Sequence, residues 1–108
     1  MNALTPERLF DQRLADGELF RLGEAGKGDA GVIVSVGAAE GEVEGLSRSE
    51  LERRLLEMGF VEGARVKVLH EGFLGRDPIA VQLDDMRVAL RRREAADVLV
   101  RRLTASDE

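Results

Sequence analysis

The second half of the chain is built from short runs in which large apolar residues alternate with smaller or polar ones, and tight turns separate these runs. In the clearest pair, apolar residues fill every second position of 79–83 and of 86–90, and only Asp84 and Asp85 lie between the two runs. A period of two is typical of strands with one buried face, and a two-residue connection is typical of a β-hairpin. Similar runs predict further strands over 32–36, 64–71 and 98–100. We therefore expect a mainly β fold of about five short strands.

One segment carries the signals of a helix instead. Leu51, Leu55 and Met58 recur at the spacing of a single helix face. Gly59 follows at the position where helices often end in a left-handed residue, and Phe60 is placed to fold back on Leu55. Two pairs fit the capping-box pattern at the helix start, namely Ser47 with Glu50 and Ser49 with Glu52. The sequence thus predicts one helix, inserted after the first strand and ending at Gly59.

Five short strands and one helix are too few for a sandwich, so we expect a small, strongly bent barrel that hides its sheet edges. At 108 residues the chain has room for one domain. We place this domain at 19–101, after an extension over 1–18 and before a disordered tail over 102–108. Thr5 and Pro6 suit the start of a short helix in the extension, and a frayed segment is the alternative.

The same pattern predicts which segments are irregular and which side chains are buried. Loops or turns are expected over 37–45, 72–78 and 91–96, where glycines or charged residues interrupt the alternation. The expected core consists of Val32, Val34, Leu51, Leu55, Val66, Val68, Ile79, Val81, Val88, Leu90 and Val98.

The composition argues against catalysis, nucleic-acid binding and membrane insertion. With no cysteine and one histidine, the chain cannot assemble a nucleophile, base and orienting group of the usual kind, and it has no phosphate-binding loop. A net charge of −5, with four phenylalanines, no tyrosine and no tryptophan, disfavours binding to a phosphate backbone or to exposed bases. The apolar runs are too short to span a bilayer. We therefore expect a cytoplasmic protein that is not an enzyme, binds no nucleic acid and does not insert into a membrane.

One weak set of metal ligands can be drawn from His70, Glu71 and Asp77, which flank one expected loop. Ferrous iron accepts imidazole and carboxylate ligands, but nothing in this spacing makes the three side chains converge. The alternative places His70 at the end of a strand, half-buried in phase with Val66 and Val68, with Glu71 in solvent. We expect no resident cofactor, and bound ferrous iron is kept as the alternative.

Two arginine clusters, over 91–93 and 101–102, suggest a basic patch. The alternative is a solvated face that Glu94 and Asp97 balance. If the patch is functional, an acidic protein surface suits it better than RNA does, because the chain is acidic and poor in aromatic residues.

Four segments occur in the order and spacing of one known family. Over 54–63 (RLLEMGFVEG), a helix ending in Met-Gly-Phe leads to a Glu-Gly turn. Residues 73–79 (FLGRDPI) carry a near match to a Gly-Asp-Pro-Ile motif, and 88–92 (VALRR) ends a strand in basic residues. Together with an opening strand within 19–33, these segments resemble the FeoA family, the small cytoplasmic component of bacterial ferrous iron transport. Arg76 departs from the tightest form of the motif by adding one residue to that loop.

The resemblance implies an SH3-like barrel and a role as an accessory of FeoB, the membrane protein that couples a GTP-binding domain to ferrous iron uptake. We therefore hypothesise a module that binds a FeoB-type membrane GTPase transporter and modulates its nucleotide cycle or its assembly. The alternatives are a ferrous iron-binding sensor and a nucleic-acid-binding SH3-like barrel, and self-association to a homo-oligomer stays open.

We place the partner-binding site on the loop over 72–78. Phe73 and Leu74 are apolar residues at the tip of this loop, where exposed apolar side chains are a liability unless a partner covers them. Arg76 and Asp77 would supply the polar rim of the interface. In the alternative, Phe73 caps the open end of the barrel and only Leu74 is exposed.

Overall fold

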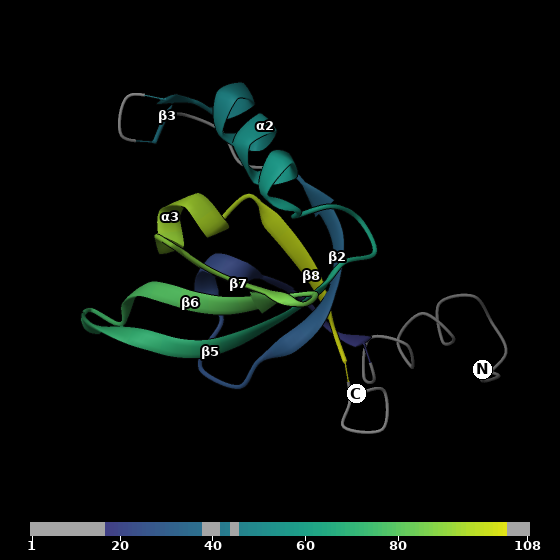
Figure 1. The fold of residues 1–108 in the computed structure, drawn as a ribbon, viewed down its shortest axis with the longest axis vertical. Helices are drawn as coiled ribbons and strands as arrows, with labels where there is room; N and C mark the ends of the chain where they lie inside the picture. The colour runs from purple at the N-terminus through teal and green to yellow at the C-terminus, as the bar shows by residue number, and fades with distance from the viewer. Residues whose placement is uncertain (1–16, 38–41, 44–45, 104–108) are drawn as a thin grey trace, which may run out of the picture.

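The computed structural model describes residues 17–37, 42–43 and 46–103, and a six-stranded antiparallel sheet dominates this part of the chain (Figure 1). The strands follow the order β1-β8-β2-β5-β6-β7 across the sheet. Their bounds are β1 (Leu19–Arg21), β2 (Ala30–Val36), β5 (Arg65–Leu74), β6 (Asp77–Leu83), β7 (Met86–Leu90) and β8 (Val98–Arg102). The predicted mainly β class is confirmed, and the predicted tight hairpin between β6 and β7 is present.

The sheet contains one strand more than we expected, because β1 pairs with β8 at one edge. A separate two-stranded ribbon joins β3 (Glu42–Val43) to β4 (Leu46–Ser47), so the prediction of an irregular loop over 37–45 is wrong in part. The predicted N-terminal helix lies outside the described residues, as does the tail from residue 104 onward. In the described ranges, no helix is both long and apolar enough to cross a membrane.

The predicted helix is present as α2 (Arg48–Met58). Ser47 caps it: the Ser47 side chain accepts a hydrogen bond from the Glu50 amide, and the Ser47 amide donates to the Glu50 carboxylate. The earlier of the two candidate capping boxes is therefore the one that forms. Gly59 follows the last helical residue in the left-handed conformation, with φ of 112°, which only glycine adopts at little cost.

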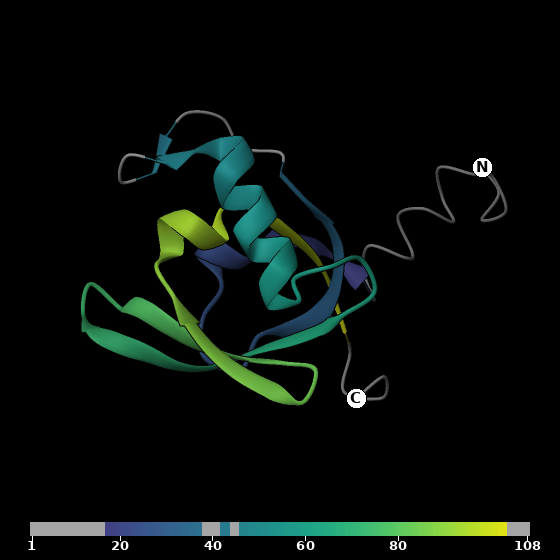
Figure 2. The ribbon, with the colours of Figure 1, turned by 45° about the horizontal axis from the view of Figure 1, so that its top comes forward.

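The inner face of α2 packs against the sheet and covers one end of it (Figure 2). Leu51 and Leu55 are buried, as their spacing predicts. Met58, which we expected on the same face, is exposed at the end of the helix.

Strand β2 buries the face opposite to the one we predicted. Ile33 is buried, whereas Val32 and Val34 are half-buried and lie outside the core. Gly31 shares the inward phase of Ile33 and lies so close to β8 that a Cβ there would stand 2.2 Å from the carbonyl oxygen of Arg101. A run of consecutive β-branched residues has no alternation of its own, so this close approach of β2 to β8 decides which residues face inward. The placement of Val32 and Val34 in the core is therefore wrong.

Most of the other predicted core residues are buried, namely Leu51, Leu55, Val66, Val68, Ile79, Val81, Leu90 and Val98. Val88 packs against this core while staying partly exposed. Residues outside the predicted core contribute as well: Leu22 comes from the 3-10 turn η1 (Leu22–Glu24), and Ala95 from the short helix α3 (Arg92–Ala95). The prediction of a polar turn over 91–96 is wrong because this segment folds as a helical turn that buries Ala95.

Candidate partner-binding site

The segment that we expected to be a loop over 72–78 is the end of a long β-hairpin. β5 runs to Leu74 and β6 begins at Asp77, so only Gly75 and Arg76 form the turn. Both turn residues have positive φ, 67° and 60°, as the common two-residue type I′ turn requires. The loop prediction is wrong because strand pairing continues to Leu74 and Asp77. Figures 1 and 2 show this hairpin projecting from the body of the sheet.

Phe73 and Leu74, the last two residues of β5, are both exposed at the end of the hairpin. The relative exposure is 104% for Phe73 and 86% for Leu74. The register of β5 against β6 shifts just before Leu74, where Gly72 lies so close to the facing strand that a Cβ would stand 2.3 Å from the carbonyl oxygen of Asp77. Phe60, in contrast, is wholly buried in the core. The alternative in which Phe73 caps the barrel is therefore wrong.

Arg92 of α3 fixes the base of the hairpin. Its NH1 group donates to the carbonyl oxygens of Gly23 and Ala25, in and directly after η1, at 3.2 Å and 2.6 Å. Its Nε donates to the carbonyl oxygen of Arg76 at 2.8 Å. Its NH2 donates to the carboxylate of Glu71 at 2.7 Å. One half-buried guanidinium thus ties the turn to the rest of the fold, which lowers the ordering cost when the tip binds a partner.

Both carboxylates near the tip face arginines. Glu71 receives Arg92 at 2.7 Å and lies 3.7 Å from NH1 of Arg76. Asp77 accepts a hydrogen bond from the backbone amide of Arg92 at 2.9 Å, and its other oxygen lies 4.0 Å from NH1 of Arg91. The predicted rim residues therefore lie next to the apolar pair: Arg76 is exposed in the turn, and Asp77 is half-buried at the start of β6.

The structure does not bring the three weak metal-ligand candidates together. An irregularity between Val68 and His70 changes the phase of β5, so His70 pairs with Ala80 and is exposed, while Glu71 pairs with buried Ile79. The expectation of a half-buried His70 with Glu71 in solvent is therefore wrong. In the part of the chain that the structure describes, no group of three or more His, Cys, Asp or Glu residues could hold a metal ion. The absence of a resident cofactor stays a prediction, and bound ferrous iron stays its alternative.

The predicted arginine patch is only partly a surface. The side chain of Arg92 is 17% exposed, and Asp97, which we expected to balance the patch in solvent, is 0% exposed. NH1 of Arg48, at the start of α2, donates to Oδ1 of Asp97 at 3.2 Å. Oδ2 of Asp97 accepts no hydrogen bond from any residue that the structure describes. No local pattern in the sequence marks Asp97 for burial. Its partner Arg48 lies at the start of α2, 49 residues earlier in the chain.

A second ion pair joins the end of β8 to the turn before β2. NH1 of Arg102 donates to Oδ1 of Asp29 at 2.7 Å, and the Gly26 amide donates to Oδ2 at 2.7 Å. Burial raises the pKa of Asp29, but the hydrogen bonds from Gly26 and Arg102 outweigh burial and leave this pKa below its usual value. The Arg102 guanidinium also lies 4.5 Å from the centroid of the Phe20 ring.

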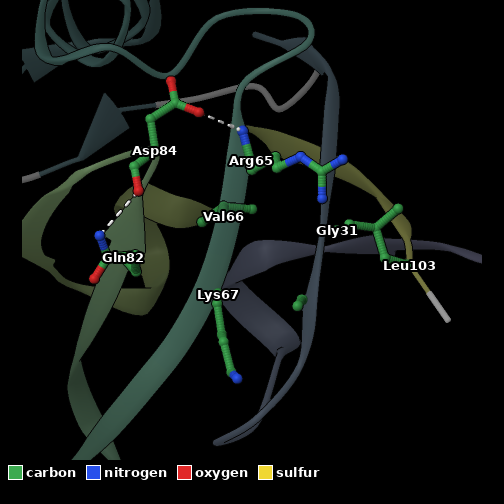
Figure 3. Close-up of a pocket in the computed structure, with 8 residues that line it drawn as sticks. Gly31, Arg65, Val66, Lys67, Gln82, Asp84 and Leu103 are labelled. Atoms are coloured by element: carbon green, nitrogen blue, oxygen red, sulfur yellow. Dashed lines mark hydrogen bonds between the residues drawn. The ribbon is translucent and has the colours of Figure 1, made fainter. Parts of the chain in front are cut away.

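A shallow groove of about 220 Å³ lies at the opposite end of the β5–β6 hairpin (Figure 3). Arg65 and Lys67 line it from β5, and the Gln82 side chain beside it donates to the Asp84 carbonyl oxygen at 2.9 Å. None of the residues that line the groove belongs to the tip. The groove and the apolar tip are therefore separate surfaces.

Known proteins resemble this chain in sequence and in fold. A family model described as FeoA domain matches residues 20–102. An Fe(2+) transport protein A/Fe(2+) transporter FeoB fusion protein of Porphyromonas gingivalis is 38% identical over 87 residues, which make up 81% of this chain and 9% of the fusion protein. The chain therefore spans a small part of the length of that relative.

Two solved structures extend the likeness to three dimensions. FeoA of Stenotrophomonas maltophilia, complexed with zinc and described as a prokaryotic SH3 domain protein, is 32% identical with a TM-score of 0.60, over 82% of this chain and 93% of that one. FeoA of Chlorobium tepidum is 32% identical with a TM-score of 0.61, over 82% of this chain and 74% of that one. The predicted SH3-like barrel is confirmed.

Proposed function

This chain belongs to the FeoA family, and on that basis we propose that it is a non-enzymatic, cytoplasmic accessory protein of ferrous iron transport that binds a FeoB-type membrane GTPase transporter. The relative from Porphyromonas gingivalis supports this partner, because there the two proteins are named as parts of one fusion protein. A covalent fusion keeps two domains at a high effective concentration, which is useful when they act on each other.

The observation that carries the proposal is the apolar tip of the β5–β6 hairpin. Phe73 and Leu74 together expose two large apolar side chains, and the Arg92 contacts hold the hairpin that presents them. Hot spots of interfaces are apolar or aromatic anchors that enter a pocket of the partner and lose their water there. The tip therefore serves as the anchor that docks on the cytoplasmic G-protein region of the transporter.

Docking alone does not alter a nucleotide cycle. A binding module shifts a GTPase between its states only when it binds one state more tightly than the other. We therefore expect the affinity of this protein for the transporter to differ between the GTP-bound and GDP-bound forms, and titrations in both nucleotide states measure that difference.

Leu74→Asp tests the site. Leu74 makes little contact with its own chain, so the change leaves the melting temperature nearly unchanged while it abolishes co-purification with the transporter. Val61→Asp is the matched control, because it places the same carboxylate on another exposed apolar residue away from the hairpin. If Leu74→Asp binds the transporter as tightly as the wild type does, the site lies elsewhere on the surface.

A deletion strain tests the role in the cell. Under iron limitation, we expect ferrous iron uptake to fall without this protein and to recover with the wild-type chain, but not with Leu74→Asp. Undiminished uptake in the deletion strain would contradict an accessory role in iron transport.

A further inference from the structure

In two ion pairs beside the apolar tip the more exposed partner is positive, whereas the protein as a whole is acidic. The whole chain carries a net charge of −5. Beside the tip, Arg76, Arg91 and Arg92 meet the carboxylates of Glu71 and Asp77 in ion pairs. A third carboxylate, that of Glu94, accepts a hydrogen bond from the Arg91 amide at 2.7 Å. Glu71 and Asp77 are only 20% and 28% exposed, less than Arg76 and Arg91, so the charge that these two pairs present to solvent is mainly positive.

Two of these arginines are free to meet a partner. The side chains of Arg76 and Arg91 are 75% and 54% exposed, and their distances to Glu71 and Asp77 are long, 3.7 Å and 4.0 Å. Exposed ion pairs of this kind contribute little to stability, so their cations can change partners at low cost. Arg92 is different, because it is half-buried and makes short hydrogen bonds to the Ala25 carbonyl oxygen and the Glu71 carboxylate. We call Arg76 and Arg91 the basic collar of the tip.

We propose that the tip fits a receptor site in which an apolar socket for Phe73 and Leu74 is surrounded by carboxylates that pair with the basic collar. This inference rests on the proposed docking to the transporter, and it specifies the surface that the transporter must present. The socket takes up the two apolar side chains and holds the complex, whereas the acidic rim attracts the collar over a distance. On a molecule of net negative charge, a local positive region also orients the tip toward an acidic surface during the encounter.

A protein socket suits these features better than a lipid surface does. Attraction to an anionic membrane amounts to about 1 kcal/mol for each basic residue near the surface, and lipid-binding segments carry clusters of about four to eight lysines or arginines. The collar has two exposed arginines, and the tip has two apolar side chains. A rigid hairpin end with one aromatic anchor and a small charged rim has instead the features of a protein hot spot.

The test measures association and dissociation rates between the full chain and the cytoplasmic G-protein region of the FeoB-type transporter from the same organism, at several salt concentrations. The charge-reversal variant is Arg76→Glu with Arg91→Glu. Its matched control is Arg53→Glu with Arg54→Glu, which makes the same change of net charge on exposed arginines of α2. Melting curves establish that both variants are folded.

For the collar variant we expect an association rate about tenfold or more below that of the wild type at low salt, and a difference that shrinks as salt screens the charges. The control variant is expected to associate within about threefold of the wild type. Equal rates for the collar variant and the wild type would overturn the inference, as would an equal loss in the control. If the wild type does not bind the transporter at all, both the proposed function and the inference fail.

A vesicle arm distinguishes a lipid partner from a protein partner. The wild type is sedimented with phosphatidylcholine vesicles that contain phosphatidylglycerol and with vesicles of phosphatidylcholine alone. We expect no sedimentation with either. Sedimentation with the anionic vesicles that the collar variant loses would show that the collar binds a membrane, and it would overturn the inference.

Discussion

The buried pair of Arg48 and Asp97 leads to the sharpest stability prediction, because its two partners are enclosed to different degrees. The side chain of Asp97 is 0% exposed, whereas that of Arg48 is 20% exposed. Removing either partner leaves the other without its charge complement. The two single substitutions should therefore differ in cost, although they break the same contact of 3.2 Å.

Arg48→Ala leaves a carboxylate that cannot reach water, and removing one partner of a buried pair costs about 3–5 kcal/mol. Asp97→Ala leaves an arginine whose long stem lets the guanidinium turn toward solvent, so about 1–3 kcal/mol is expected. The double variant should resemble Asp97→Ala, because it contains no uncompensated carboxylate. Against a total stability of about 5–15 kcal/mol, Arg48→Ala comes close to unfolding the domain.

Urea denaturation followed by circular dichroism measures these differences, since the chain contains neither tryptophan nor tyrosine for fluorescence. The order that we expect, from most to least stable, is wild type, then Asp97→Ala together with the double variant, then Arg48→Ala. If Arg48→Ala costs no more than Asp97→Ala, the reasoning from unequal burial is refuted.

Three further outcomes are expected. Gly72→Ala lowers the melting temperature, because its Cβ would stand 2.3 Å from a carbonyl oxygen of the facing strand. Gly26→Ala is the control and is tolerated, because its Cβ has no neighbour nearer than 3.9 Å. Equal melting temperatures for the two variants would contradict the close approach at Gly72. Leu55→Ala costs about 2–5 kcal/mol in urea denaturation, and a change below about 1 kcal/mol would mean that α2 does not pack on the barrel. The lowered pKa of Asp29 stabilises the fold above the ordinary pKa of an aspartate, and this contribution disappears as the pH falls through the lowered value. Asp29→Asn should therefore lower stability at neutral pH and lose its effect in acid, and an effect that does not change with pH would contradict the pairing with Arg102.

Several elements follow from the sequence alone, because the residues that specify them lie close together in the chain. The hairpin of β6 and β7 needs only alternation and two turn residues. Helix α2 needs one apolar stripe, a cap at Ser47 and a glycine at its end. The apolar pair at the tip is likewise visible in the sequence, as two large apolar residues between glycines.

Other features depend on segments that are far apart in the chain. Which side chains of β2 face the core depends on how closely Gly31 approaches β8. Which face of β5 His70 lies on depends on an irregularity in the pairing of β5 with β6. A run such as Val32 to Val36 is apolar on both faces, so only packing selects one of them.

The support of the candidate site was likewise decided by the tertiary structure. Arg92 and Gly23 are 69 residues apart, and Arg48 and Asp97 are 49 residues apart. In the sequence Arg92 is the middle of three arginines and Asp97 is an ordinary acid. Local sequence signals specify helices and turns over a few neighbouring residues. The burial of a charged side chain depends instead on every segment that packs around it. The sequence could therefore predict an apolar tip, but only the folded chain decides that the tip is held in place and fully exposed.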